Sequence, residues 1–129
     1  MLLLSLPSRA TATPKGTLDD PEFKRASWEW VQDTAAATTT WGTLGVWDVT
    51  AVKDFSHAFS ASRNIDGGSS VANGNPKVKT FTSFAGLAKW ITSSVTSLHS
   101  VFASAAAMNE KLDGWAVSKV KDFSRCVPW

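Results

Sequence analysis

The sequence contains few of the residues from which covalent cross-links and metal sites are built: one cysteine and two histidines among 129 residues. A single cysteine excludes an intramolecular disulfide framework and any zinc site that needs several cysteines. The two histidines have no cysteine pair to complete a ligand set, so they predict no metal site. Thirteen Lys and Arg against eleven Asp and Glu leave a net charge of +2, which does not predict nucleic-acid binding. We therefore expect no metal, no cofactor and no nucleic-acid partner.

Long apolar runs are also missing, so we expect no transmembrane span, which would need about 20 apolar residues. The N-terminal run Met1–Leu6 is short, and the basic residue Arg9 follows it. A secretory signal has the opposite order, with its basic residues first. The sequence therefore contains no convincing signal peptide. Residues 1–26 are rich in Thr, Ser, Pro and charge without a sustained period, which predicts a poorly ordered lead-in.

Tyrosine is absent, whereas tryptophan and phenylalanine each occur seven times, and three of the tryptophans begin an internal repeat. The three copies start at Trp47, Trp90 and Trp115. Each copy has Thr or Ser three residues after its Trp, Val five residues after it, and a large apolar residue eight residues after it. The string VKDFS occurs in two copies, at 52–56 and 120–124. Matches at several equivalent positions are typical of a repeat protein.

The repeat length is 25 residues between Trp90 and Trp115, whereas 43 residues separate Trp47 from Trp90. Residues 64–80 account for the difference, because this segment is rich in Gly, Asn, Ser and Pro and predicts a loop inserted into the first copy. Insertions in repeat arrays lie on one face, often the face that binds a partner. Drift in a solvated loop without a partner is the alternative.

Within each copy, apolar residues step by three and four, as from Val95 to Leu98 to Phe102, which predicts one face of a short helix. The Thr or Ser before each run is placed to act as the helix N-cap. Asp54 and Asp122 then fall in the first helical turn, where the helix dipole favours a carboxylate. Before each helix, the spacing of a Leu and the Trp predicts a turn that leads into a short strand.

A strand and a short helix in every 25 residues predict an α/β fold, a short solenoid of about three strand-plus-short-helix coils that share one core. We expect residues 27–46 to form a degenerate first coil, 47–63 a coil, 64–80 the inserted loop, 81–114 a coil and 115–129 a truncated coil. Together these segments form one repeat domain over residues 27–129, after the lead-in.

The repeat tryptophans are expected to form a column through this core. A groove in which exposed indoles stack on sugar rings is the alternative, but the Trp position repeats in register with apolar residues that have no such use. The expected core residues of the repeat are Trp47, Val52, Phe55, Phe59, Trp90, Val95, Leu98, Phe102, Met108, Leu112, Trp115, Val120 and Phe123.

The pattern W-x-V-S/T-x-V-x-x-F/M-x-x-x-F-x-x-A-x-x-F/M-N-x-x-L-x-x-W is similar to the BspA-like leucine-rich repeat of bacterial and protist surface proteins. The copy that starts at Trp90 fits it best, with Met108, Asn109 and Leu112 in place. The resemblance covers residues 44–129. It implies a right-handed, leucine-rich-repeat-like solenoid that is exported to the cell surface or secreted and is used for adhesion or protein recognition. It implies no catalytic residues.

The few residues with reactive side chains do not form a catalytic pattern. His57 and His99 lie ten and nine residues after their tryptophans, so they are not equivalent, and we expect both at solvated helix positions. Cys126 lies near the apolar face, where a packed thiol is expected. Asp54 and Asp122 are equivalent positions two coils apart, which places them roughly 10 Å from each other and predicts a ladder of charges instead of an acid–base pair.

We therefore predict a non-enzymatic repeat domain that presents a protein-recognition or adhesion surface and is a fragment of a larger cell-surface protein. Its partner would be another protein, a host or matrix surface, or further repeats of the same chain. A carbohydrate-binding module with exposed tryptophans and an inactive gene fragment are the alternatives. An enzyme would need a buried cluster of His and carboxylates, which the sequence does not offer.

Overall fold

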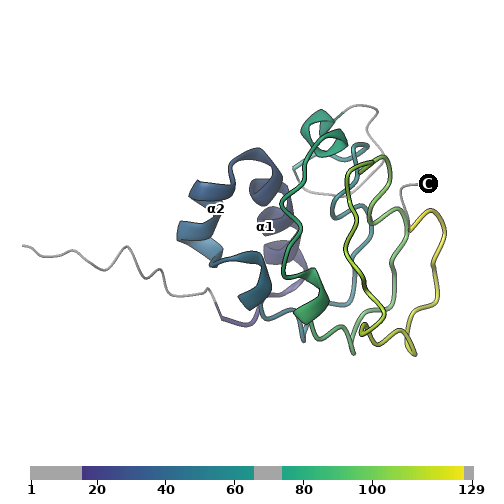
Figure 1. Cartoon of the computed structure of the whole chain (residues 1–129). Coiled ribbons are helices and arrows are strands. Elements are labelled where there is room, and N and C mark those ends of the chain that lie inside the picture. Colours follow the sequence, from purple (N-terminus) through teal and green to yellow (C-terminus); the bar gives the residue numbers. More distant parts are fainter. Residues whose placement is uncertain (1–15, 66–73, 127–129) are drawn as a thin grey trace, which may run out of the picture.

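A computed structural model describes residues 16–65 and 74–126 (Figure 1). Helices α1 (Asp20–Gln32) and α2 (Thr34–Trp41) lie at one end of the molecule, and the tryptophan-headed copies run side by side at the other end. Three short 3-10 helices follow in the chain, η3 (Leu44–Val46), η4 (Pro76–Lys79) and η5 (Leu87–Lys89). Neither described range contains a β-strand, so the predicted α/β solenoid of strand-plus-helix coils is wrong.

The local sequence explains why α1 begins at Asp20. Asp19 and Glu22 form a capping box, in which each carboxylate accepts a hydrogen bond from the other residue's amide. Pro21 lies in the first turn, where its missing N–H removes no helical hydrogen bond. Residues 20–26 are therefore helical, where the sequence analysis expects a poorly ordered lead-in.

Helix α2 follows after a single residue. Asp33 is its N-cap and accepts a hydrogen bond from the Ala36 amide, and Gly42 ends the helix with a φ of 83°. The two helices thus occupy most of the segment 27–46, for which the sequence analysis expects a degenerate first coil. None of the helices in ranges 16–65 and 74–126 is long and apolar enough to cross a membrane.

The segments predicted as short helices consist of successive tight turns. In the first copy the amide of Val52 bonds the carbonyl of Val49, and the amide of Ala58 bonds that of Phe55. The residue ten places after each Trp then has a positive φ, which no right-handed helix can contain. These residues are His57 (60°), Ser100 (54°) and Arg125 (56°). The apolar residues spaced three and four apart therefore face the core from a succession of tight turns, and they do not mark one face of a helix.

The carboxylates predicted at helix starts have a different role in these turns. Asp54 accepts a hydrogen bond from the Ser56 amide at 2.8 Å, and Asp122 accepts one from the Ser124 amide at 2.9 Å. Such bonds to the residue two places on are Asx turns, which replace a backbone turn. Ser97 holds the equivalent place in the middle copy, where its hydroxyl accepts from the His99 amide at 3.3 Å.

The segments predicted as helices are joined to one another by isolated parallel bridges, which link Asp54 to Ser97 and Ser97 to Asp122. Around these bridges the copies stay in register, because equivalent amides bond equivalent carbonyls. The Phe55 amide donates to the Ser97 carbonyl at 3.0 Å, and the Leu98 amide donates to the Asp122 carbonyl at 2.9 Å. The copies are therefore held together by backbone pairing over a few residues each.

The inserted segment 64–80 returns to the body of the protein after residues 66–73, which lie outside the described ranges. Val78 of η4 is fully buried, and the buried Asn75 donates to the Ser60 carbonyl at 3.2 Å and accepts from Gln32 at 2.6 Å. The end of the insertion is thus packed against α1 and the first copy, and is not a wholly solvated loop.

We expect Trp90→Ala to lower the free energy of unfolding by about 3–5 kcal/mol. The substitution leaves a cavity between two stacked indoles and deprives the Leu44 carbonyl of its indole donor. The neighbouring Ile91 is 62% exposed, so Ile91→Ala should change stability by no more than about 0.5 kcal/mol. Urea unfolding of both variants measures the difference, and equal midpoints would contradict the packing described here.

Candidate recognition surface

Ten of the thirteen residues expected in the repeat core are buried, and the other three lie toward one end of the molecule. Leu112 and Val120 are half-buried, and Phe123 is 48% exposed. The equivalents of Phe123 in the first two copies, Phe55 and Leu98, are 0% and 6% exposed. Burial at this position is therefore lost only in the third copy, because no further copy covers it in the described structure.

The repeat tryptophans form the column that joins the copies. The Trp47 and Trp90 ring centroids are 5.6 Å apart, those of Trp90 and Trp115 are 6.2 Å apart, and both pairs are stacked. Two of the indole N–H groups also donate to the leucine three residues before the preceding repeat Trp: Trp90 bonds the Leu44 carbonyl at 2.7 Å, and Trp115 bonds the Leu87 carbonyl at 2.8 Å. The same side chain thus supplies apolar burial and a directional bond between copies.

The third copy presents an apolar cavity of about 330 Å³ at the surface. Its lining includes Phe102 and Met108 of the middle copy. We call the surface formed by Leu112, Val117, Phe123 and Cys126 the end face. A hollow of apolar side chains with an exposed aromatic ring at its rim is typical of a site that another molecule covers.

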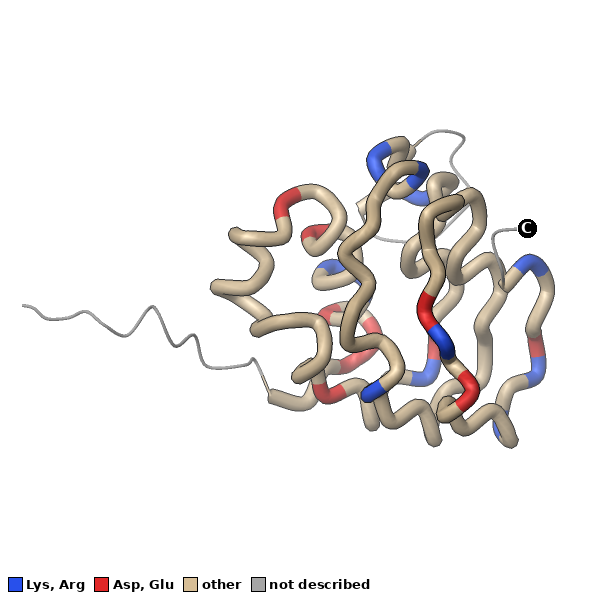
Figure 2. The backbone as a smooth tube through the Cα atoms, viewed as in Figure 1, with Lys and Arg blue, Asp and Glu red and all other residues tan. Residues whose placement is uncertain are grey.

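Charges of both signs surround the end face. The described part of the third copy carries Lys119, Lys121 and Arg125 against the single acid Asp122, and all four are exposed. The carboxylate residue Glu110 lines the cavity itself. Figure 2 shows acidic segments on the side of α1 and also toward the other end of the molecule. The end face is thus an apolar patch with basic residues on the third copy and an acidic residue at the cavity, which favours a partner with an apolar centre and charges of complementary sign around it.

A family model described as "Mycoplasma protein of unknown function, DUF285" matches residues 31–127, which is most of the chain. The chain belongs to this family. The resemblance to BspA-like leucine-rich repeats is therefore wrong as an identification, and the absence of strands from the described ranges agrees with that correction. No curated protein and no solved structure matches the chain.

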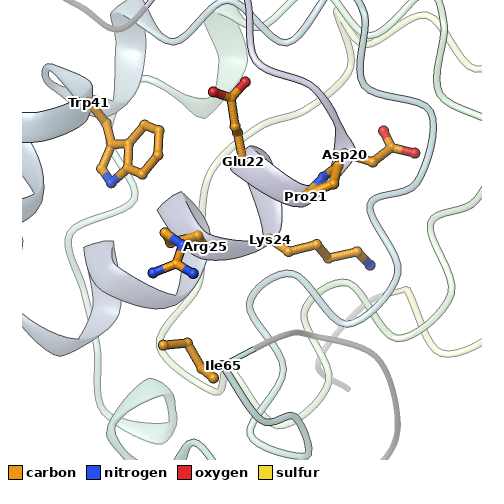
Figure 3. Close-up of a pocket in the computed structure, with 7 residues that line it drawn as sticks. All are labelled: Asp20, Pro21, Glu22, Lys24, Arg25, Trp41 and Ile65. Carbon is orange, nitrogen blue, oxygen red and sulfur yellow. The ribbon is translucent and has the colours of Figure 1, made fainter.

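A second, larger hollow of about 580 Å³ lies beside the N-terminal half of α1. Figure 3 shows that the side chains of Asp20 and Lys24 extend away from those of Arg25 and Trp41, so its charged groups do not converge. The Trp41 indole N–H already donates to Glu29 at 2.8 Å. Lys24 bonds the Ser56 carbonyl at 3.0 Å and lies 3.4 Å from the Asp54 carboxylate. Lys24 thus holds α1 against the first copy, Trp41 holds α2 against α1, and these groups do not form a catalytic arrangement.

His57 is buried, contrary to the solvated position expected for it. It is 9% exposed, and its Nδ1 atom has no hydrogen-bond partner within the described ranges. Its ring meets that of the half-buried His99 edge to face, with centroids 5.2 Å apart. Burial, followed by the proximity of His99 and Lys24, lowers the pKa of His57. Two histidines that are not equivalent in sequence thus meet, because the His57 amide donates to the His99 carbonyl at 2.9 Å in the backbone pairing of the copies.

His99 also takes part in a cluster that resembles a hydrolytic triad in composition only. Its Nδ1 lies 2.6 Å from the Ser124 hydroxyl, which in turn donates to the Asp122 carboxylate at 2.5 Å. In a catalytic triad the acid orients the far nitrogen of the histidine, whereas here the acid binds the serine itself. Hydrogen bonds from the Ser124 hydroxyl and amide lower the pKa of Asp122. The bond from the amide is the one that forms the Asx turn. The cluster is a turn between two copies.

Arg63 is the most important structural residue that the sequence analysis did not identify. It is fully buried and donates to the carbonyls of Ala58 at 2.6 Å and Lys24 at 2.7 Å, and to the Ser27 hydroxyl at 2.9 Å. Its guanidinium also lies 5.5 Å from the centroid of the Trp28 ring. Arg63 therefore fastens α1 to the end of the first copy. No spacing or motif around it signals this role.

Metal binding finds no support in the described part of the chain, where no group of three or more His, Cys, Asp or Glu side chains could hold an ion. Cys126 is half-buried at the end face, beside the apolar lining of the cavity. Its place in that lining fits a packed thiol.

The lowered pKa of His57 makes stability dependent on pH. As the pH falls through about 6.5, the unfolded chain takes up a proton at this position before the folded protein does, so the folded state loses stability. We expect His57→Asn, which suits the positive φ, to weaken the fall in unfolding free energy between about pH 7.5 and pH 5.5. Urea titrations at several pH values measure it, and identical slopes for both proteins would refute the assignment.

We expect Arg63→Met to lower the free energy of unfolding by about 3 kcal/mol or more, because several buried oxygens lose their donor at once. Arg25 of α1 is exposed, so Arg25→Met is the matched control and should cost no more than about 0.5 kcal/mol. Thermal and urea unfolding of the pair give the comparison. A similar small cost for both variants would show that Arg63 does not anchor α1.

Proposed function

We propose that this protein is a non-enzymatic recognition domain that binds another protein through the end face. The observation that carries the proposal is the apolar cavity in the third copy, with Phe123 48% exposed at a position that is buried in the other copies. Apolar and aromatic side chains surrounded by charge are the usual composition of a protein-binding patch. The basic residues of the third copy and the acidic Glu110 in the cavity lining add electrostatic selectivity.

A carbohydrate-binding module with exposed tryptophans receives less support. The five tryptophans at positions 30, 41, 47, 90 and 115 are all at most 8% exposed, and Trp28 is half-buried under the Arg63 guanidinium. Sugar rings stack on indole faces that solvent can reach. Five of the six described indoles are closed to such stacking and the sixth is half-buried, so we favour protein recognition over sugar binding.

The cell-surface location and the adhesive role were implied by the BspA-like resemblance, which the family assignment replaces. Both stay predictions without further support, and the proposal concerns protein recognition only. The inactive-fragment alternative makes an opposite prediction, because a decayed fragment should have no specific partner at the end face.

Site-specific photo-crosslinking tests the proposal in cells that naturally make the protein. The photoreactive amino acid p-benzoylphenylalanine replaces Phe123 in one variant and the exposed Ile91, away from the cavity, in the control. We expect discrete protein adducts from position 123 and only background from position 91, because specific partners cover the aromatic anchor of a binding patch. Equal background from both positions would refute recognition through the end face and favour the inactive fragment.

A further inference from the structure

We propose that the end face accepts one further tryptophan-headed repeat unit, supplied by another polypeptide and paired in the same register as the copies within the chain. This inference rests on the proposed function and specifies the class of partner. The contacts that join one copy to the next recur at equivalent positions, so they define what the next contact must be.

The backbone pairing between copies follows one rule. The amide eight residues after a Trp donates to the carbonyl seven residues after the next Trp, as Leu98 does to Asp122 at 2.9 Å. The amide ten residues after a Trp donates to the carbonyl nine residues after the next, as Ser100 does to Ser124 at 2.9 Å. In return, Lys121 donates its amide to the Thr96 carbonyl at 2.8 Å. The first and middle copies are joined by the same three kinds of bond.

The third copy presents the corresponding groups without partners. By the same rule, the amides of Phe123 and Arg125 and the carbonyl of Lys121 should bond a following copy, and within the described ranges none of them has a hydrogen-bond partner. Unpaired backbone groups along an edge are a template for another extended chain. Binding of a peptide by backbone pairing, with side chains placed in apolar hollows, is an established mode of recognition.

The end face also contains the place for the next tryptophan. The carbonyls of Leu44 and Leu87, each three residues before a repeat Trp, accept the indole N–H of the following copy. Leu112 is the equivalent residue in the third copy and lines the apolar cavity together with Trp115. An incoming indole would therefore stack on Trp115 and donate to the Leu112 carbonyl.

An intact second copy of this chain does not fit, because its own first repeat is already covered. Helix α1 takes the place of a preceding unit: the Asp20 carboxylate accepts the Lys53 amide at 2.8 Å, and the Phe23 ring stacks on Phe55 with centroids 4.5 Å apart. The Trp47 indole donates to the Gly42 carbonyl at the end of α2. The partner must instead have an uncovered Trp, with Val five residues later and a large apolar residue eight residues later.

A synthetic peptide of residues 90–114 tests the inference as a stand-in for the incoming unit. We expect fluorescence anisotropy of the labelled peptide to show saturable binding to the intact protein, and Phe123→Asp to weaken it about tenfold or more. Ile91→Asp, at an exposed position away from the end face, should leave the affinity unchanged. A peptide with its Trp and following Val replaced by Ala should not bind. Circular dichroism checks that both protein variants remain folded.

Hydrogen exchange distinguishes backbone pairing from unspecific apolar binding. We expect the amides of Phe123 and Arg125 to gain about tenfold or more protection when the peptide binds. Binding without this protection, or no binding, would overturn the proposed register and partner class. Photo-crosslinks from position 123 would in that case still support protein recognition, so the two proposals fail separately. A dimer of the protein that Phe123→Asp dissociates would likewise overturn the inference, because a second copy would then occupy the end face.

Discussion

The hydrogen bonds from the Trp90 and Trp115 indoles to the carbonyls of Leu44 and Leu87, three residues before the preceding repeat Trp, are the contacts on which the rest of the structure depends. The copies contain no strand and no α-helix in the described ranges, so they have little regular hydrogen bonding of their own. Their conformation is held by neighbours, through the stacked rings of Trp47, Trp90 and Trp115 and through a few backbone pairs at each junction. Repeat arrays in general derive their stability from such nearest-neighbour contacts.

This dependence on neighbours makes the two ends of the array different. On one side, α1 and α2 cover the first copy. The Asp20 carboxylate and the Gly42 carbonyl accept its hydrogen bonds, and the Phe23 ring packs on its apolar side chains. On the other side, the third copy presents the same set of apolar and backbone groups, which no residue of the described ranges covers. The asymmetry is the physical basis for assigning recognition to the end face, since the internal junctions show which chemistry such a surface binds.

The family assignment and the structure together correct the resemblance drawn from the tryptophan pattern. The spacing of Trp, Val and Phe is shared by several kinds of stacked repeat, because any chain that packs copies against one core needs apolar residues in register. The pattern therefore identified a repeat but not the backbone of its units. Positive φ values at His57, Ser100 and Arg125 end each turn before a helix can form, and local side-chain spacing does not report them.

The sequence by itself determined the register of the copies and most of the side chains that face inward, because apolar spacing records which positions avoid water whatever the backbone does. Only the tertiary structure decided that turns replace the helices and strands, that α1 and α2 cover the first copy, and that Arg63 and His57 are buried. These features depend on hydrogen bonds between residues far apart in the chain, such as Trp90 and Leu44, and no local pattern encodes such pairings.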